Sequence, residues 1–429
     1  MTEHPESACC VDYERVAGLS RRRFLAGMAA ASGVAVTTTA FGDALRQTSF
    51  AATTGGNVLV VISLRGGIDG LGMVVPHGDP GYYTARPRLA LPPGSLIAKD
   101  EMFGLHPGMA PLQWLWNAGE LAAVHAVGLE VPNRSHFLAM EEVENADPTS
   151  SVRRGWVNRM IGLADSAGKP YEAVHLGEAI APTALVGTAP ALSARSLEGI
   201  ALAAADGRYA ARRRAQLSTM WRGARGPLGD AARSALTTVG ELGPVASSTY
   251  RPTVRYPTEF PATGLAEALQ DTAHLIKADV GTEVVTIDYG SWDMHNNYGT
   301  TEYGNMQRMV GGFARVVSAF LKDLGPLRTR VTLVTISEFG RRVAENGNRG
   351  LDHGWGNMML LMGGGVRGGR YYANWPGLGR AALADGDLQV TTDYRNVLGE
   401  VVATRFAQRS ATAVFPGLHY RPLGVMAGA

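Results

Sequence analysis

The sequence predicts an α/β fold in which flanking helices cover a mostly parallel central sheet. Short β-rich runs without polar interruption are typical of strands that are buried on both faces of a parallel sheet. These runs alternate with segments whose apolar residues have helical spacing, and this alternation indicates strand–helix–strand units. Beyond a short N-terminal leader, roughly 380 residues remain, which is enough for one large domain or two modest ones.

The first expected strand is the run 57–64 (NVLVVISL), which ends at a loop with three glycines at 66, 67 and 70. A helical pattern at 109–116 precedes the apolar run 121–127, and another at 303–324 lies between the runs 283–287 and 331–336. The last apolar run ends in three consecutive glycines at 363–365. The further strands are expected at 121–127, 283–287, 331–336 and 357–362, and helices at 109–116, 303–324 and 393–407.

Residues 196–242 depart from this alternation. The segment is rich in Ala and Arg, lacks a strand pattern, and carries Arg212, Arg213 and Arg214 within a helical pattern. We expect a helical insertion that packs on the sheet, with the arginine run as a solvated helix face; a specific anionic partner is the alternative. We therefore divide the chain into a leader with linker, 1–51, and one α/β domain, 52–429, that contains the insertion.

The N-terminal segment Ser20-Arg21-Arg22-Arg23-Phe24-Leu25 resembles a twin-arginine export signal. The apolar run that follows, to about residue 41, is too short and too mild for a membrane span. An ordinary secretory leader or a basic tail is the alternative. We expect the twin-arginine translocase to export the folded protein to the periplasm, cell envelope or extracellular space. Small-residue cleavage sites lie near Ala40, Ala44 and Ala51.

The composition excludes several classes of function. A formal net charge of +2 gives no basis for nucleic-acid binding. Both cysteines, Cys9 and Cys10, precede the export motif, so the mature chain offers no disulfide, thiolate metal site or cysteine nucleophile. No later apolar stretch reaches about 18 residues, so we expect a soluble or peripheral mature protein without a transmembrane segment.

Polar side chains follow the expected strands, where functional groups gather in parallel α/β sheets. Such carboxylates and imidazoles could bind one or two divalent metals through O and N ligands. A serine hydroxyl beside a metal can act as a nucleophile. The candidate residues are Asp69, Ser135, Asp293, His295, Glu338 and His353.

Each candidate also has a purely structural explanation. Asp69 lies in a glycine turn, where Asp is a common turn former. Ser135 could cap a helix that starts at Phe137. The other two carboxylates could be exposed loop charges, and the two histidines could be hydrogen-bonded core groups.

Several segments in combination resemble an uncharacterised family known as domain of unknown function 1501. The resemblance runs from about residue 57 to the C-terminus, and the family is grouped with the alkaline-phosphatase-like superfamily of phosphatases, sulfatases and cofactor-independent phosphoglycerate mutases. The segments are LRGGIDGL at 64–71, RSHF at 134–137, WDMH at 292–295, SEFGR at 337–341, DHG at 352–354 and GGGVRGG at 363–369.

This resemblance implies an alkaline-phosphatase-like sheet below two metals and a nucleophilic Ser or Thr. In chain order, Asp69 resembles the first metal-binding Asp and Ser135 occupies the place of the nucleophile. Asp293 and His295 resemble the Asp and His of one metal site. Glu338 stands where an Asp ligand of the other site falls, and His353 resembles the last His ligand.

The chain also departs from the superfamily pattern. Glu338-Phe339 stands where Asp-His is usual, which removes one His ligand. Asp293 and His295 are two residues apart, where a spacing of four is common. No Cys/Ser-x-Pro-x-Arg pattern occurs, which argues against formylglycine sulfatase chemistry.

Two functions follow from this comparison. The first is an exported metal-dependent hydrolase of a small phosphate or sulfate ester, with Ser135 as the nucleophile and Arg65, Arg134 or Arg341 as clamps for the anionic oxygens. The second is a non-catalytic binding or assembly protein that retains the fold.

The donor types predict one tight metal site. Asp293, His295 and His353 supply one O and two N donors, a set that suits Zn²⁺ or a similar ion. Asp69, Ser135 and Glu338 supply only oxygens, which suits Mg²⁺, Ca²⁺ or Mn²⁺. We expect Phe339 to leave this second site weak or empty.

Overall fold

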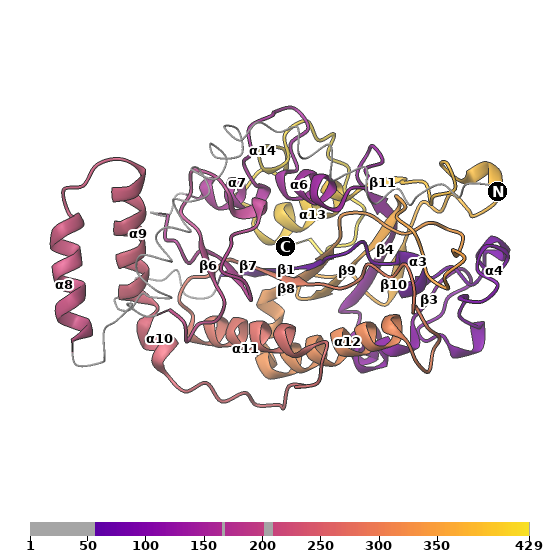
Figure 1. Cartoon of the computed structure of the whole chain (residues 1–429), viewed down its shortest axis with the longest axis horizontal. Helices are drawn as coiled ribbons and strands as arrows, with labels where there is room; N and C mark the ends of the chain where they lie inside the picture. Colours follow the sequence, from indigo (N-terminus) through magenta and orange to yellow (C-terminus); the bar gives the residue numbers. More distant parts are fainter. Residues whose placement is uncertain (1–55, 165–167, 201–208, 429) are drawn as a thin grey trace, which may run out of the picture.

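A computed structural model describes residues 56–164, 168–200 and 209–428 (Figure 1). The expected export signal at 20–25, the two cysteines and the candidate cleavage sites lie outside this range. Nine strands of the described chain form one sheet in the order β10–β4–β9–β8–β1–β7–β5–β6, with β11 also paired to β4. The strands are β1 Val58–Leu64, β4 Leu121–Gly128, β5 Ala173–Leu176, β6 Leu192–Ala194, β7 Val284–Tyr289, β8 Val331–Ile336, β9 Asn357–Gly363, β10 Arg370–Tyr372 and β11 Thr392–Asp393.

The prediction of a mostly parallel α/β sheet is confirmed. Within this sheet every pairing is parallel except the two that β9 makes with β4 and β8. The five expected strands correspond to β1, β4, β7, β8 and β9. Because β9 runs against its neighbours, its first residue lies at the edge where β1, β4, β7 and β8 end. The loop 337–356 between β8 and β9 therefore belongs to that edge.

Two layers of helices bury the two faces of the sheet (Figure 1). The helices α11 (Thr263–Ala278) and α12 (Asn305–Leu324) cover one face. The opposite face carries α6 (His136–Asn145), α7 (Trp156–Gly162), α13 (Tyr394–Arg405) and α14 (Ala411–Val414).

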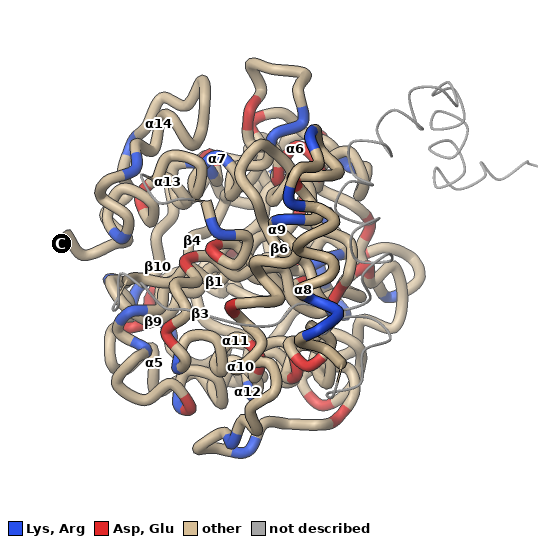
Figure 2. The backbone as a smooth tube through the Cα atoms, turned by 90° about the vertical axis from the view of Figure 1, so that its left-hand side faces the viewer, with Lys and Arg blue, Asp and Glu red and all other residues tan. Residues whose placement is uncertain are grey.

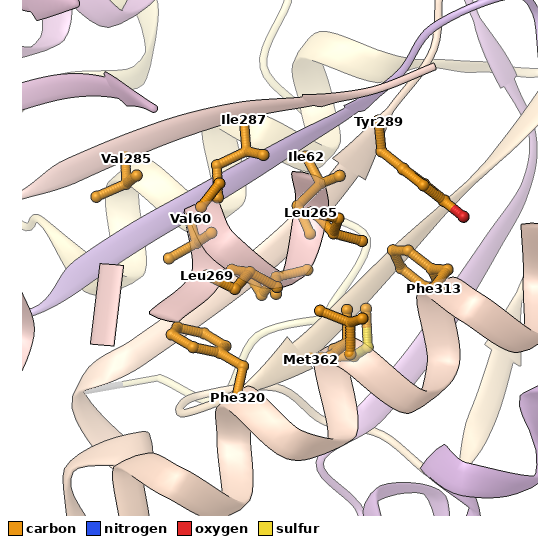
Figure 3. Packing of buried hydrophobic residues seen from close by; sticks show 14 of the residues in the cluster. Val60, Ile62, Leu265, Leu269, Val285, Ile287, Tyr289, Phe313, Phe320 and Met362 are labelled. Atoms are coloured by element: carbon orange, nitrogen blue, oxygen red, sulfur yellow. The ribbon is translucent and has the colours of Figure 1, made fainter. Parts of the chain in front are cut away.

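The residues of β1 alternate between these two cores, as strand geometry requires. Val60 and Ile62 pack with Leu269 and Phe320 on the α11–α12 side (Figure 3), and Val61 packs in the opposite core. All seven residues of β1 are buried. A polar substitution anywhere in this strand would thus face an apolar core, which is why its sequence is unbroken by polar groups other than Ser63.

Shorter elements connect these layers. The expected helix at 109–116 is divided into a 3₁₀ segment, η3, and the short helix α5, because Pro111 lacks the N–H that a continuous α-helix needs. These elements are α3 Gly70–Met73, α4 Pro80–Ala85, α5 Gln113–Asn117, the 3₁₀ segments η2 Pro93–Ser95, η3 Pro107–Leu112, η4 Thr183–Leu185, η5 Gly325–Arg330 and η6 Arg380–Ala382, and the strand pair β2 Val74–Val75 and β3 Gly104–Leu105.

The expected insertion contains α8 (Ala210–Trp221), α9 (Pro227–Glu241) and α10 (Gly243–Ser247). The hairpin of α8 and α9 lies beyond β6 at one end of the molecule and does not cover a sheet face (Figure 1). Helix α9 buries Leu236 and Val239, whereas α8 has no buried residue. Basic positions of α8 are blue in Figure 2, and Arg212 and Arg213 are exposed. Among the described residues, no helix is long and apolar enough to cross a membrane.

Candidate metal centre

The carboxyl edge of the sheet brings together loops that follow β1, β4, β7 and β8. Gly66, after β1, has φ +106°, and a Cβ at this position would lie 2.7 Å from the backbone N of Asp293. Trp292 N–H donates to the carbonyl of Arg65 at 3.1 Å, which joins the same two loops. The glycine is therefore required both for its backbone conformation and for the close approach of the loop that carries Asp293.

Three imidazoles converge on one oxygen of Asp293. The Oδ1 atom lies 3.1 Å from Nε2 of His295, 3.2 Å from Nε2 of His353 and 3.6 Å from Nε2 of His136. The Nε2 atoms of His295 and His353 are 3.1 Å apart. A tetrahedral zinc ion with bonds of about 2.0–2.1 Å holds its ligand atoms about 3.3 Å apart. The separations among Asp293, His295 and His353 are close to this value. His136, Asp293 and His353 form a group whose ligand atoms all lie within 4.8 Å of one another.

The outer nitrogen of each imidazole is held by an acceptor. Nδ1 of His136 contacts Oε1 of Glu338 at 2.7 Å. Nδ1 of His295 contacts Oδ1 of Asp352 at 2.8 Å. Nδ1 of His353 contacts the carbonyl oxygen of Arg134 at 2.9 Å. Because carboxylates and carbonyls only accept, each Nδ1 is the donor in these contacts, and Nε2 of each ring faces the centre, where it can bind a cation or carry a second proton.

The inward lone pairs require a cation or protons between them. Nε2 of His136 is buried and has no hydrogen-bond partner. Nitrogen lone pairs that face a carboxylate oxygen repel one another unless positive charge lies between them. Three nitrogens and one oxygen are the donors that zinc and similar divalent ions take from proteins. The residues present therefore fit a divalent metal.

The electrostatics of the metal-free centre agree with this arrangement. Burial lowers the pKa of His136, but the carboxylates of Asp293 and Glu338 outweigh burial and raise this pKa to about 9. Burial raises the pKa of Asp293, and the contacts with His136, His353 and Arg341 shift it far below the usual range of an Asp. Without a metal, the position between these groups thus attracts protons, with which a cation must compete.

Phe339 forms one wall of the centre. Its ring centroid lies 4.9 Å from those of His136 and His353, and the side chain is almost completely buried. At the position where the resemblance has a His ligand, this chain packs an apolar ring against the imidazoles of two candidate ligands. The ring restricts their rotation and excludes water from that side.

Asp69 is engaged elsewhere. Arg86 donates to its two oxygens at 2.6 and 2.9 Å, and the hydroxyl of Tyr298 donates to it at 2.6 Å. Arg86 and Asp69 are both buried, and Arg86 also donates to the carbonyl of Val343. Burial raises the pKa of Asp69, but the charge of Arg86 outweighs burial and lowers it. In this structure a guanidinium neutralises the Asp69 carboxylate, and the role of metal ligand that the resemblance implies for Asp69 stays a prediction.

Glu338 accepts hydrogen bonds at both of its oxygens and contacts His136. Its Oε1 accepts from the backbone N–H of Gly66 at 2.8 Å as well as from His136. Its Oε2 accepts from the hydroxyl of Ser337 at 3.0 Å. These contacts give Glu338 a role in positioning His136, and the all-oxygen site of Asp69, Ser135 and Glu338 stays a prediction.

The three arginines expected to clamp an anion are all paired within the protein. Arg341 is buried, and it donates to the carbonyl of Gly67 and, at 2.6 Å, to Asp293. Arg65 pairs with Glu144 and Asp288, and Arg134 pairs with Asp385 and Asp387. The structure therefore gives Arg341 and Arg65 roles in joining loops, and the carbonyl of Arg134 orients His353.

Ser135 directly precedes His136 at the N-terminus of α6. Its hydroxyl makes no capping hydrogen bond, and the backbone N–H of Ser135 donates to Oδ1 of Asn133 at 3.0 Å. The capping role that explains many serines at this position is thus not used here. The half-buried hydroxyl remains available at the edge of the centre.

Sequence reasoning missed two residues of the centre, His136 and Asp352, although both lie in the quoted segments RSHF and DHG. His136 follows the expected nucleophile and was assigned no role. Its role depends on Glu338, which lies 202 positions away in the chain. An imidazole beside a candidate nucleophile, after an expected strand, was the available signal.

Residues 255–400, about a third of the chain, match the family model described as "Protein of unknown function (DUF1501)". The expected family resemblance is confirmed for this segment. It contains Asp293, His295 and His353, and the segment that holds Ser135 and His136 lies outside it. A search of curated proteins gave no significant match.

Solved structures similar to the chain include sulfatases and a hydrolase. The C-terminal periplasmic domain of EcEptC from Escherichia coli, in complex with Zn, is 11% identical with a TM-score of 0.34, over 75% of this chain and 77% of that chain. The PsFucS1 sulfatase from Pseudoalteromonas sp. is 12% identical with a TM-score of 0.34, over 93% and 75%. The phosphonate monoester hydrolase of Agrobacterium radiobacter is 10% identical with a TM-score of 0.33, over 81% and 73%. These likenesses are remote, so the chemistry must be judged from the centre itself.

Proposed function

We propose that the protein is an exported metal-dependent hydrolase of phosphate or sulfate esters that uses one divalent cation. One observation supports this most strongly: three Nε2 atoms surround Oδ1 of Asp293, while an acceptor holds each outer nitrogen. His136, Asp293, His295 and His353 would hold the cation, with zinc as the ion that best suits these donors. A bound divalent cation supplies Lewis-acid stabilisation of negative charge on an ester oxygen.

The chain's own residues supply the nucleophile and the alignment. Ser135 is the proposed nucleophile, because its hydroxyl is uncapped and belongs to the residue next to His136. Glu338 and Asp352 fix the tautomer and the ring orientation of the two imidazoles that they contact. Arg341 holds Asp293 in place from the buried side.

The export part of the proposal depends on the N-terminal motif. Replacing Arg21 and Arg22 together by Lys preserves the charge but removes the pair that the translocase receptor reads. We expect the precursor of this variant to remain in the cytoplasm. Unchanged export would rule out the twin-arginine route, whatever the catalytic activity.

The hydrolase is tested on the purified protein with p-nitrophenyl phosphate and p-nitrophenyl sulfate, with and without Zn²⁺ or Mn²⁺. We expect metal-dependent release of p-nitrophenol. Ser135→Ala should lose turnover while it still binds the metal, and His353→Ala should lose both. Ser218→Ala, in helix α8, is the matched control and should keep both.

A non-catalytic binding protein is the second candidate, and the arginine contacts favour it. Arg65, Arg134 and Arg341 are all charge-paired within the protein, so none of these three is left to clamp an ester anion. Metal binding without turnover of either ester would select this candidate. Absence of metal binding would overturn the centre itself.

A further inference from the structure

Exposed apolar side chains lie next to two residues of the candidate centre, Ser135 and His136, in the sequence. Phe137 is 84% exposed, although it directly follows His136 and lies two residues after Ser135. Leu138, the next residue of α6, is 57% exposed, and Val131, in the loop before α6, is 71% exposed. We name Val131, Phe137 and Leu138 the apolar rim.

The rim lies close to the proposed nucleophile. Two trans peptide links separate the Cα atoms of Ser135 and Phe137, which limits their distance to about 7.6 Å. The loop before α6 is tied to this helix because Asn133 donates to Oε1 of Glu142 at 3.1 Å. A molecule whose reacting group sits at Ser135 therefore has Phe137 within reach of a short alkyl chain, with Leu138 one residue further along α6.

We infer that the substrate is an amphiphilic ester, with its anionic ester group at the centre and its alkyl chain on the apolar rim. This inference rests on the proposed function and names the substrate class. A cation-binding centre beside exposed apolar side chains is complementary to a molecule with a charged head and an apolar tail.

The surroundings of the rim disfavour two other occupants. Glu130 is 79% exposed, and α6 carries Glu141 and Glu142 on the side that faces solvent. Arg153 is already paired with Glu141, so the rim lacks the excess of basic residues that attracts an anionic bilayer. A stable interface with a second copy buries about 800 Å² per partner, far more than three side chains provide.

The test measures how affinity changes with chain length. Alkylphosphonates of two, four, six and eight carbons, used below their micelle concentrations, are titrated into the zinc-loaded and the metal-free protein by calorimetry. Full burial of one methylene raises affinity about fourfold, so a rim that covers one side should give about twofold per methylene. The same dependence is expected in kcat/KM for the matching alkyl phosphates.

In the variant Phe137→Ser/Leu138→Ser, affinity should no longer change with chain length, at about one-fold per methylene. Met220→Ser is the control, because Met220 is 64% exposed on helix α8, away from the centre, and this variant should keep the dependence. Circular dichroism and zinc titration show whether the double variant is folded. If it is not folded, the single variant Leu138→Ser is measured and should reduce the dependence partly.

A flat series for the unmodified protein overturns the inference. If the short-chain phosphate is still hydrolysed, the proposed function stands and only the substrate class is wrong. If chain length raises affinity but no ester is hydrolysed, the rim stands and the hydrolase fails. Two further measurements identify the occupant if the series is flat. Sedimentation of the protein with phosphatidylcholine or phosphatidylglycerol vesicles would show that the rim binds a bilayer. A dimer that the substitution Phe137→Ser dissociates would show that the rim binds a second copy of the chain.

Discussion

Removal of the His136 side chain is the most direct test of the centre. Structural zinc sites bind with about 10–16 kcal/mol, so one of four ligands contributes about 2.5–4 kcal/mol, or about 10²–10³ in affinity. Nε2 of His136 is the most distant donor, 3.6 Å from Oδ1 of Asp293, where the other two lie at 3.1 and 3.2 Å. We therefore expect His136→Ala to weaken zinc binding by about 10², the lower end of this range.

The variant Glu338→Gln probes the partner of His136. It keeps an acceptor for Nδ1 but removes the negative charge, so its effect should match that of outer contacts, at the lower end of about 10–100-fold. His419→Ala, at an exposed position, is the control and should leave zinc affinity unchanged. The order of affinities should be unmodified protein and control, then Glu338→Gln, then His136→Ala.

The assay is competition between the protein and a chromophoric chelator for zinc at fixed pH and ionic strength. Thermal unfolding gives an independent value, because zinc at 100 times its Kd stabilises the unmodified protein by about 2.7 kcal/mol. At the same zinc concentration, a variant with a 100-fold higher Kd gains only about 0.4 kcal/mol. If His136→Ala binds zinc as tightly as the unmodified protein while His353→Ala does not, His136 is not a ligand and the reasoning from its orphaned nitrogen is refuted.

Three further variants test the structure around the centre by chemical or thermal unfolding. Gly66→Ala should lower the free energy of unfolding by more than about 3 kcal/mol and abolish zinc binding. The control Gly281→Ala, with φ +90° but open space around its Cβ, should lower it by only about 1–2 kcal/mol. Equal losses in the two variants would contradict the close approach of the loops at Gly66. Arg86→Met leaves the buried carboxylate of Asp69 without its partner and should lower the free energy of unfolding by about 3–5 kcal/mol. Arg88 is half-exposed, so the control Arg88→Met should lower it by less than about 1 kcal/mol. Burial raises the pKa of Asp271 to about 6, whereas the pKa of an Asp in the unfolded chain is about 3.9. The folded state therefore binds this proton more tightly than the unfolded state, and the stability that the proton provides is lost as the pH rises from about 4 to 6. Asp271→Asn should therefore stabilise the protein by about 1 kcal/mol at pH 8 and have no such effect below pH 4; a constant difference across this range would contradict the assignment.

The strands that were predicted share a strong local signal. β1 and β9 each bury seven consecutive residues, and such runs are recognisable without knowledge of their partners. Strands β6 and β10 have three residues each, and their sequences become strands only through pairing with β5 and β4. Helix α11 was missed although it carries apolar residues at helical spacing, among them Leu265, Leu269 and Ile276.

The site was predictable where position after a strand was enough. Asp293, His295 and His353 follow strands β7 and β8, and the structure brings them together. The partners of a carboxylate could not be predicted from the sequence, because they depend on contacts between distant segments. Nothing near Asp69 in the sequence shows that Arg86 will occupy its two oxygens, and nothing near Glu338 shows that its partner is an imidazole.

The charges around the centre argue for one metal per chain. With a metal bound, the three imidazoles are neutral, Asp293, Glu338 and Asp352 contribute three negative charges, and Arg341 returns one positive charge. One divalent cation balances the remaining two negative charges. A second dication would need further carboxylates, and Asp69, the one that the resemblance offers, is already neutralised by Arg86 at 2.6 Å. Elemental analysis should therefore find about one equivalent of metal per chain even when added metal is in large excess.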